Sequence, residues 1–226
     1  MAANGRRPLR WLSGVLVAAA ALAWPQVATP ASSVVAQWHM DETSGSTMHD
    51  SAGANDGSLH SVTLGRPGLS GTSYGFDGAH SYVTVPSNAS LNPGTGDMSF
   101  TVHVRYTVTP PSGATTDYDI LRKGVSATKG GFYKLEIRPD NRGVCRFAGS
   151  TADILVHAGP ALNDGKWHTI TCARTATSVT MTIDGHAYAH AHATGKISTT
   201  AALVVGAKPG SDYYNADLDE VAVRIG

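Results

Sequence analysis

The sequence predicts an all-β fold in which short antiparallel strands form a sandwich or barrel, and three observations support this. Hydrophobic residues after position 34 recur with a period of two, which is typical of half-buried strands and not of helices. Turn-forming segments rich in Gly, Pro, Asn and Asp separate these runs at intervals of about 8–12 residues. Only 15% of the 226 residues are charged and 25 are Gly, a composition typical of an ordered, turn-rich extracellular domain.

The N-terminal segment predicts export. A basic start, RRPLR, precedes a 14-residue apolar run from Trp11 to Trp24, and a stretch of small residues follows it. This layout is typical of a secretory signal peptide, with cleavage expected after Ala31. The run is shorter than the ~20 residues of a membrane-spanning helix, which disfavours the alternative of an anchor. We therefore expect a signal peptide at residues 1–31 and one secreted, extracellular domain without a membrane span at residues 32–226.

The domain contains about a dozen strand-like runs. The clearest one has an apolar face formed by Phe100, Val102, Val104, Tyr106 and Val108. Residues 133–138 and 179–183 alternate in the same way, with charged or hydroxyl side chains at the outward positions. Further runs lie at residues 34–40, 81–86, 118–124, 144–148, 154–158, 167–174, 202–206 and 218–225. No segment after the signal has the 3.6-residue period of an amphipathic helix.

The two cysteines, Cys145 and Cys172, both fall in the part predicted to be exported. An even pair in an oxidising compartment predicts a disulfide, whereas a lone reactive thiol or a metal site lacks any supporting spacing such as a CxxC pair. Each cysteine lies two positions from a hydrophobic residue of the same strand and therefore shares its inward face, so we expect both cysteines on inward faces of neighbouring strands. The chain-entropy account gives such a bridge ~3–4 kcal/mol of stabilisation.

Four segments, in order, carry a resemblance to a known family. They are an opening strand with an Asp-Ser-x-Gly-x-Asn-x-Gly loop (36–59), an FDG…YVTVP hairpin (74–92), a WHT strand returning to IDG (162–185), and a closing LDEVAVRIG strand (203–226). Together they resemble the laminin-G-like jelly roll of the concanavalin A-like lectin/glucanase superfamily. The resemblance implies a jelly-roll sandwich of two curved antiparallel sheets. Members mostly bind glycans or proteins, and many carry a structural calcium. Ala216 departs from the pattern, because the family usually has Gly there.

Charge and motifs disfavour nucleic-acid binding and catalysis. Removing Arg6, Arg7 and Arg10 with the signal leaves 14 cations against 17 acids, so no basic excess exists to displace counterions from phosphates. Glucanases of the superfamily carry an E-x-D-x-x-E strand, and this chain lacks it. The G-x-S-x-G and HExxH motifs are also absent from the sequence. We therefore expect no catalytic residues, and a degenerate glycoside hydrolase is the less favoured alternative.

Acidic residues near the two ends of the domain form a candidate calcium site. Asp50 and Asn55 lie in a Gly-rich loop, and Asp219 lies on the apolar side of the last strand, where a buried carboxylate requires a partner. The ends of a jelly roll tend to lie side by side. We therefore hypothesise that Asp41, Asp50, Asn55 and Asp219 hold one structural Ca²⁺, which takes six to eight oxygen ligands. The alternative is that these side chains cap turns and accept backbone hydrogen bonds.

A histidine cluster is a weaker metal candidate. His186, Tyr188, His190 and His192 alternate with alanines, so an extended strand would place all four on one side. Imidazoles at positions i and i+2 can share Zn²⁺, Cu²⁺ or Ni²⁺. No cysteine lies nearby in the sequence to complete such a site, and the nearest carboxylate, Asp184, belongs to the IDG turn, so adventitious surface histidines are the favoured interpretation.

Glycan binding requires aromatic faces for sugar C–H groups and polar groups for hydroxyls. The candidates are outward residues of the long strand and of its expected neighbour, together with a pair of aromatics in the GSDYYN loop. They are His103, Arg105, Lys134, Glu136, Arg138, Tyr213 and Tyr214. Trp38 and Trp167 fall in strand motifs and are expected in the core. The sequence thus predicts a secreted, calcium-stabilised, lectin-like protein that binds a glycan, with an extracellular protein-interaction or adhesion module as the alternative.

Overall fold

The structure is a computed structural model that describes Met1 and residues 32–111, 117–208 and 210–226. The predicted signal peptide therefore lies outside the described residues except for Met1, and its cleavage stays a prediction. Within the described ranges, no helix has the length and apolar character needed to cross a membrane. The one helical segment in these ranges is a 3-10 turn, η1 (Ala89–Leu91), capped by the side chain of Asn88.

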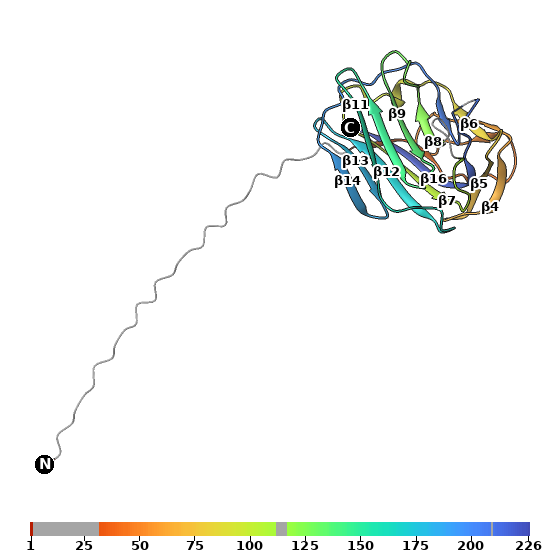
Figure 1. Cartoon of the computed structure of the whole chain (residues 1–226), viewed down its shortest axis with the longest axis horizontal. Helices are drawn as coiled ribbons and strands as arrows, with labels where there is room; N and C mark the ends of the chain where they lie inside the picture. Colours follow the sequence, from red (N-terminus) through yellow and green to blue (C-terminus); the bar gives the residue numbers. More distant parts are fainter. Residues whose placement is uncertain (2–31, 112–116, 209) are drawn as a thin grey trace. The chain divides into compact units, whose positions relative to one another are not determined.

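The strands form two antiparallel sheets, as the sequence predicts (Figure 1). Sheet A has the order β14 (His186–His190), β13 (Val179–Ile183), β12 (His168–Arg174), β7 (Met98–Arg105), β16 (Asn215–Ile225), β5 (Thr72–Asp77) and β4 (Thr63–Pro67), and β1 (Ser33–Trp38) also pairs with β16. Sheet B has the order β11 (Asp153–Ala158), β10 (Gly143–Ala148), β9 (Phe132–Ile137), β8 (Tyr118–Lys123), β15 (Leu203–Val205), β6 (Tyr82–Val85), β3 (Gly57–His60) and β2 (Thr47–Met48).

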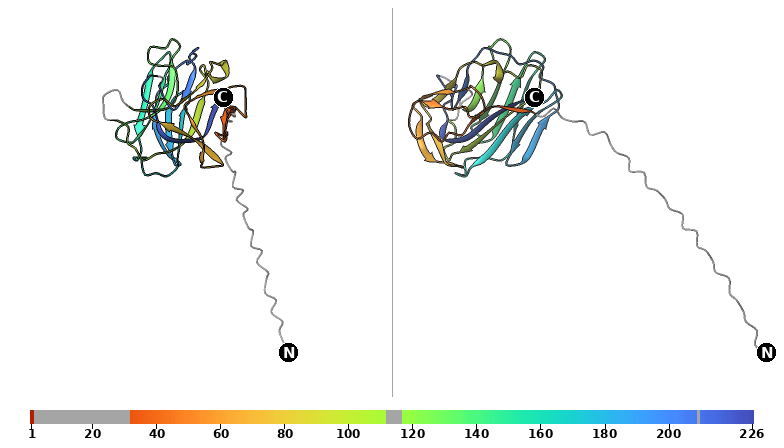
Figure 2. Two further views of the ribbon diagram at one scale, coloured as in Figure 1. Left: turned by 90° about the vertical axis from the view of Figure 1, so that its right-hand side faces the viewer. Right: turned by 180° about the vertical axis from the view of Figure 1, so that it is seen from behind.

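The first and last strands lie side by side. β1 pairs antiparallel with the second half of β16, with Ser33 opposite Ile225 and Trp38 opposite Val221. Both views of Figure 2 show the C-terminus beside the start of the described chain. The expectation that the two ends of the domain meet is therefore confirmed.

The inward faces of the two sheets form one hydrophobic core. The apolar face predicted for the long strand is buried from Phe100 to Tyr106, and the inward residues of β9 and β13 are buried as predicted. Val108 was expected on this face, but it is 51% exposed because β7 ends at Arg105 and the chain leaves the sheet there. Phe100, Tyr133 and Phe147 lie with ring centroids 5.6–6.3 Å apart and join the two sheets at the centre.

The predicted disulfide is present, but it connects different elements from those expected. Cys145 lies on β10 of sheet B and Cys172 on β12 of sheet A, with Cα atoms 5.5 Å apart. Both residues are fully buried. The bridge therefore joins the two sheets across the core instead of linking neighbouring strands, because each cysteine occupies an inward position of its own sheet.

Lys123, at the end of β8, is an uncommon buried cation. It is fully buried, and its Nζ donates to the carbonyl of Ala201 at 2.5 Å and to Ser87 Oγ at 3.4 Å. Burial disfavours the charged ammonium and lowers the pKa of Lys123 to about 8.

We expect the stability of the domain to rise between pH 7 and pH 9.5 on account of Lys123. The unfolded chain holds the lysine proton up to its ordinary pKa of about 10.4, whereas the folded chain releases it near pH 8, so the unfolded state binds more protons in this range. The gain should be roughly 2 kcal/mol and should disappear in Lys123→Met. Urea denaturation of both proteins at several pH values measures it, and equal pH slopes would contradict the prediction.

Candidate functional site

Asp50 and Asn55, two of the four predicted calcium ligands, lie together and bond to each other. Asp50 Oδ1 accepts from the backbone N–H of Gln37 at 2.9 Å and of Ala52 at 3.0 Å. Its Oδ2 accepts from the backbone N–H and the Nδ2 of Asn55 at 3.0 and 2.9 Å. Burial raises the pKa of the Asp50 carboxyl, but the Gln37, Asn55 and Ala52 donors outweigh it and hold the pKa below its usual range.

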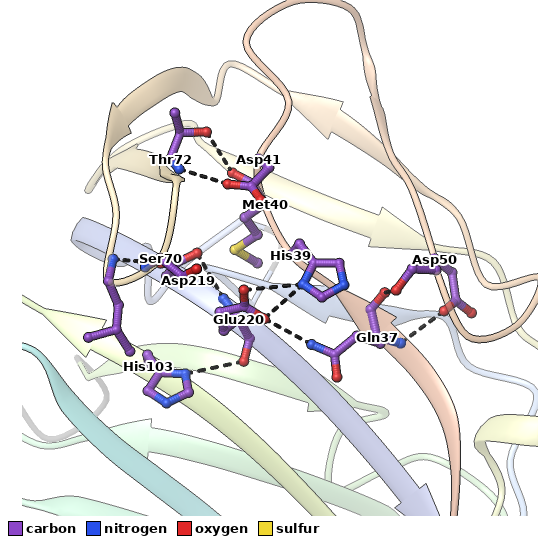
Figure 3. Close-up of polar contacts among 12 residues, drawn as sticks. Gln37, His39, Met40, Asp41, Asp50, Ser70, Thr72, His103, Asp219 and Glu220 are labelled. Atoms are coloured by element: carbon purple, nitrogen blue, oxygen red, sulfur yellow. Dashed lines mark hydrogen bonds and ion pairs between the residues drawn. The ribbon is translucent and has the colours of Figure 1, made fainter.

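Asp219 and Asp41, the other two predicted calcium ligands, accept hydrogen bonds from backbone N–H groups of the turn at residues 69–72 (Figure 3). Asp219 Oδ2 accepts from the N–H groups of Leu69 at 2.7 Å and Ser70 at 3.2 Å, and its Oδ1 accepts from the N–H of Glu220 at 3.0 Å. Asp41 Oδ1 accepts from the N–H of Thr72 at 2.7 Å. Burial of Asp219 outweighs its three donors and raises the pKa of its carboxyl.

The structure does not bring the three predicted carboxylate ligands together as one group. The carboxylates of Asp41, Asp50 and Asp219 do not come within 4.8 Å of one another as a group, and their oxygens accept backbone N–H groups. This is the arrangement expected of turn caps. Figure 3 also shows Glu220, which the sequence did not suggest as part of this site, directed at His39 and Gln37, with Oε2 3.0 Å from each side chain.

The histidine cluster lies on β14, at an edge of sheet A. His186 and His190 flank the partly buried Tyr188 on the same face of the strand, as the alternation predicts, whereas His192 follows the end of the strand. The three imidazoles do not approach within 4.8 Å of one another as a group. His192 Nδ1 instead lies 3.0 Å from the carbonyl oxygen of Ala193.

His103 and Arg105 lie on the outer face of sheet A, whereas the strand that we expected beside theirs belongs to the other sheet. β7 pairs with β12 and β16, whereas β9, which carries Lys134 and Glu136, belongs to sheet B, so the predicted adjacency is wrong. The carbonyl oxygen of Glu220 lies 3.3 Å from His103 Nδ1. The prediction failed because alternation identifies a strand and its faces but not its hydrogen-bonded neighbours.

Arg105 belongs to an ionic cluster of its own. It donates to Asp217 Oδ2 at 2.8 and 3.1 Å, and Arg66 donates to the other oxygen of the same carboxylate. The guanidinium also lies over the ring of Trp167, 4.6 Å from its centroid. Trp38 is buried in the core as predicted, but Trp167 is partly exposed on this outer face, so its predicted core position is wrong.

Tyr213 and Tyr214 do not form a common platform. Tyr214 is fully buried in the core, with its hydroxyl 3.3 Å from the carbonyl oxygen of Asp217. Tyr213 is partly exposed and belongs to the surface. One ring is therefore available to a ligand and the other is not.

Lys134 and Glu136 lie on the outer face of sheet B, but both are buried. Lys134 Nζ donates to Glu136 Oε2, and Arg138 Nε lies 3.4 Å from Glu136 Oε1. The alternation of β9 predicts their outward direction correctly. It does not reveal their burial, which results from charged neighbours on β8 and β10 that also occupy this face.

Partly exposed aromatic rings form a ladder on the same outer face, and sequence reasoning found only one of them. The rings of His60 on β3 and Tyr82 on β6 stack with centroids 4.3 Å apart and an interplanar angle of 15°. The Tyr213 ring lies 6.4 Å from that of Tyr82. Tyr82 alternates with the buried Val83, which is a signal for its outward direction, whereas β3 has no clear alternation in the sequence. We call these three residues the aromatic ladder.

Beside the ladder lies a small charged cavity of about 210 Å³. Its lining includes Asp117, Asp212, Lys134, Lys208 and Arg146, and Asp212 directly precedes Tyr213 of the ladder. Together the ladder and this cavity provide ring faces and charged groups on one surface of sheet B. This combination suits a polyhydroxylated ligand, whose C–H groups pack on rings while its hydroxyls bond to polar side chains.

Comparison with known proteins gives the family and the fold. A laminin-G family model, described as the concanavalin A-like lectin/glucanases superfamily, matches residues 77–224. No curated protein matches the sequence. Among solved structures, the binding domain of Paraclostridial Mosquitocidal Protein 1 is similar with a TM-score of 0.68 and 14% identity, over 84% of this chain and 48% of the other. The chain therefore spans about half the length of that structure.

Two further structures are similar at comparably low identity. Domain 4 of AbnA, a GH43 extracellular arabinanase from Geobacillus stearothermophilus, in complex with arabinotriose, matches with a TM-score of 0.61 and 14% identity over 86% of this chain and 93% of the other. Domains LG4-5 of the mouse laminin α1 chain match with a TM-score of 0.53 and 15% identity over 63% of this chain and 38% of the other. Such identities show a shared fold and no more. The match of the family model, over more than half of the sequence, shows that this chain belongs to the concanavalin A-like lectin/glucanase superfamily.

Proposed function

We propose that this protein is a secreted, non-catalytic, glycan-binding domain that contacts its sugar through the aromatic ladder of sheet B. The observation that carries the proposal is the ladder itself, because His60, Tyr82 and Tyr213 present partly exposed rings in a row on one sheet face. Sugar rings offer apolar C–H faces that pack on aromatic side chains. Partly exposed rings that contact each other lose little side-chain freedom when a ligand packs on them.

The neighbouring charged cavity supplies the polar groups that the proposed glycan site requires. Lys208 and Arg146 line the cavity from different segments, and Asp212 connects it to Tyr213 of the ladder. Hydroxyl groups of a glycan can donate to the carboxylates and accept from the cations. The volume of about 210 Å³ suits one sugar unit, with further units packed along the ladder.

The non-catalytic part of the proposal is supported by the pairing of the three glutamates. Glu42 accepts from the hydroxyl of Tyr74, Glu136 pairs with Lys134, and Glu220 pairs with His39. The E-x-D-x-x-E strand by which the superfamily's glucanases place their acid and nucleophile on one face is also absent from the sequence. The match to a domain solved with arabinotriose, which belongs to an arabinanase, also supports sugar binding as the function of this fold here.

We expect Tyr82→Ala and Tyr213→Ala each to weaken glycan binding by about tenfold or more, equivalent to about 1.4 kcal/mol, because each removes a packing face. The mature chain is first applied to a glycan array, with calcium and with chelator, and the glycan so found is titrated into each variant by calorimetry. Trp167→Ala is the matched control, since it removes a partly exposed aromatic from sheet A.

The outcomes separate the possible sites and functions. Loss of binding in Trp167→Ala with retention in the two tyrosine variants would place the sugar on sheet A and contradict the ladder. An array without signal, combined with specific capture of an extracellular protein, would favour the adhesion alternative over glycan binding. Secretion is tested separately, because export predicts a mature N-terminus at Ser32, which mass spectrometry of the secreted chain measures.

A further inference from the structure

Three aspartates from two distant segments meet at the cavity beside the ladder. Asp117 precedes β8, Asp119 lies on β8, and Asp212 lies in the connection between β15 and β16. One carboxylate oxygen from each lies within 4.8 Å of the other two, the only such group among the described His, Cys, Asp and Glu side chains. The backbone N–H of Asp119 donates to the carbonyl of Asp212 at 3.0 Å, which fixes the two segments to each other.

Each of the three carboxylates has a buried oxygen that lacks a hydrogen-bond donor among the described residues. This oxygen is Oδ1 in Asp117, Asp119 and Asp212. Asp119 is 1% exposed, and the side chain of Asp212 is 5% exposed. A buried carboxylate oxygen without a donor costs about 1–3 kcal/mol or more, so three at one place indicate a missing partner.

The neighbouring cations do not supply that partner, because they bond to the other oxygens. Arg122 donates to Oδ2 of Asp119. Lys208 and Ser211 donate to Oδ2 of Asp212 at 3.2 and 3.1 Å. The nearby Lys134 is paired with Glu136. Among the described residues, Oδ1 of each of the three aspartates therefore remains without a donor, although cations line the same cavity.

We propose that Asp117, Asp119 and Asp212 bind a divalent cation of the Ca²⁺ type through these free oxygens. Hard divalent cations select oxygen ligands, and Ca²⁺ binds them at 2.3–2.6 Å in a flexible geometry. Three carboxylate oxygens within 4.8 Å of one another reach that distance from a common centre with shifts of about half an ångström or less. Mg²⁺ requires shorter bonds, so it would require the three carboxylates to move together. The adjoining cavity has room for the further oxygen ligands, water molecules or the hydroxyls of a bound sugar, that complete six to eight ligands.

The proposal is tested with the mature chain and the metal alone, so its outcome does not depend on the proposed glycan function. After removal of metals with a chelator, CaCl₂ is titrated by calorimetry. Tb³⁺ luminescence, excited through the nearby tyrosines, gives a second readout that Ca²⁺ should reverse. We expect one site, a rise in melting temperature with Ca²⁺, and affinity lower by on the order of tenfold or more in Asp119→Asn and in Asp117→Asn.

The choice of the Asp117 variant and of a control at Asp50 allows the experiment to contradict the proposal. Asp117 is only partly buried, so Asp117→Asn should fold even if the substitution at the buried Asp119 does not. Asp50→Asn is the matched control, because it removes a carboxylate that bonds to backbone N–H groups in a different loop. No heat and no luminescence, or a loss of affinity in Asp50→Asn that spares Asp117→Asn, would overturn the proposal.

Discussion

Replacing both cysteines, as Cys145→Ala with Cys172→Ala, is expected to lower the free energy of unfolding by ~3–4 kcal/mol. The bridge closes a loop over a sequence separation of 27 residues, so removing it releases chain entropy in the unfolded state. It also removes the covalent connection between the sheets, which are otherwise held together here by packing of the core. For a domain of this size the loss corresponds to roughly 10 °C in melting temperature. Urea denaturation of the oxidised wild type and the double variant measures the difference.

Two controls separate the bridge from ordinary packing. Val156→Ala, opposite Cys145 on β11, removes methyl groups from the same region and should cost only on the order of 1–2 kcal/mol. Wild type unfolded and refolded in a reductant should be as unstable as the double variant. A double variant within about 0.5 kcal/mol of the oxidised wild type would show that the disulfide does not stabilise the fold.

Local alternation made the strands with one buried and one polar face predictable. Residues 133–138 and 179–183 follow it, and both form strands with the expected inward residues. It failed to identify β2, β3 and β4, because short strands near the edges of a sheet have few buried positions to produce a pattern. Alternation also extended the long strand too far, to Val108, because a hydrophobic residue beyond the end of β7 continues the period by chance.

The candidate site was less predictable because its parts come from strands that are distant in the chain. The neighbour of a strand in the sheet is fixed by tertiary pairing, so Arg105 and Lys134 were assigned to one surface and lie in different sheets. The ladder requires β3 beside β6, and the three aspartates require the loop after β15 to reach β8. Asp219 was correctly expected to be buried and in need of partners. Those partners are backbone N–H groups, which no residue pattern can reveal.

Replacing that carboxylate, Asp219→Ala, is expected to cost about 3 kcal/mol of unfolding free energy. Each backbone N–H left without an acceptor costs about 1–3 kcal/mol, and part of the total is offset because the buried charge of the carboxylate is removed as well. Asp219 is fully buried and accepts three backbone N–H groups, from Leu69, Ser70 and Glu220. Two of these fix the turn between β4 and β5 against β16. The third holds Glu220 at a φ of 48°, a conformation that a non-glycine residue adopts only when its surroundings impose it.

The matched control is Asp41→Ala, which removes one bond to the same turn, that of Thr72 N–H, from an exposed carboxylate. It should cost less than about 1 kcal/mol, because water can replace an exposed acceptor. Denaturation of both variants with a chelator and with calcium then distinguishes the two roles considered for Asp219. A turn anchor loses the same stability under both conditions. If the loss appears only when calcium is present, Asp219 acts through the metal that its sequence position first suggested, and the assignment of its carboxylate to the backbone is wrong.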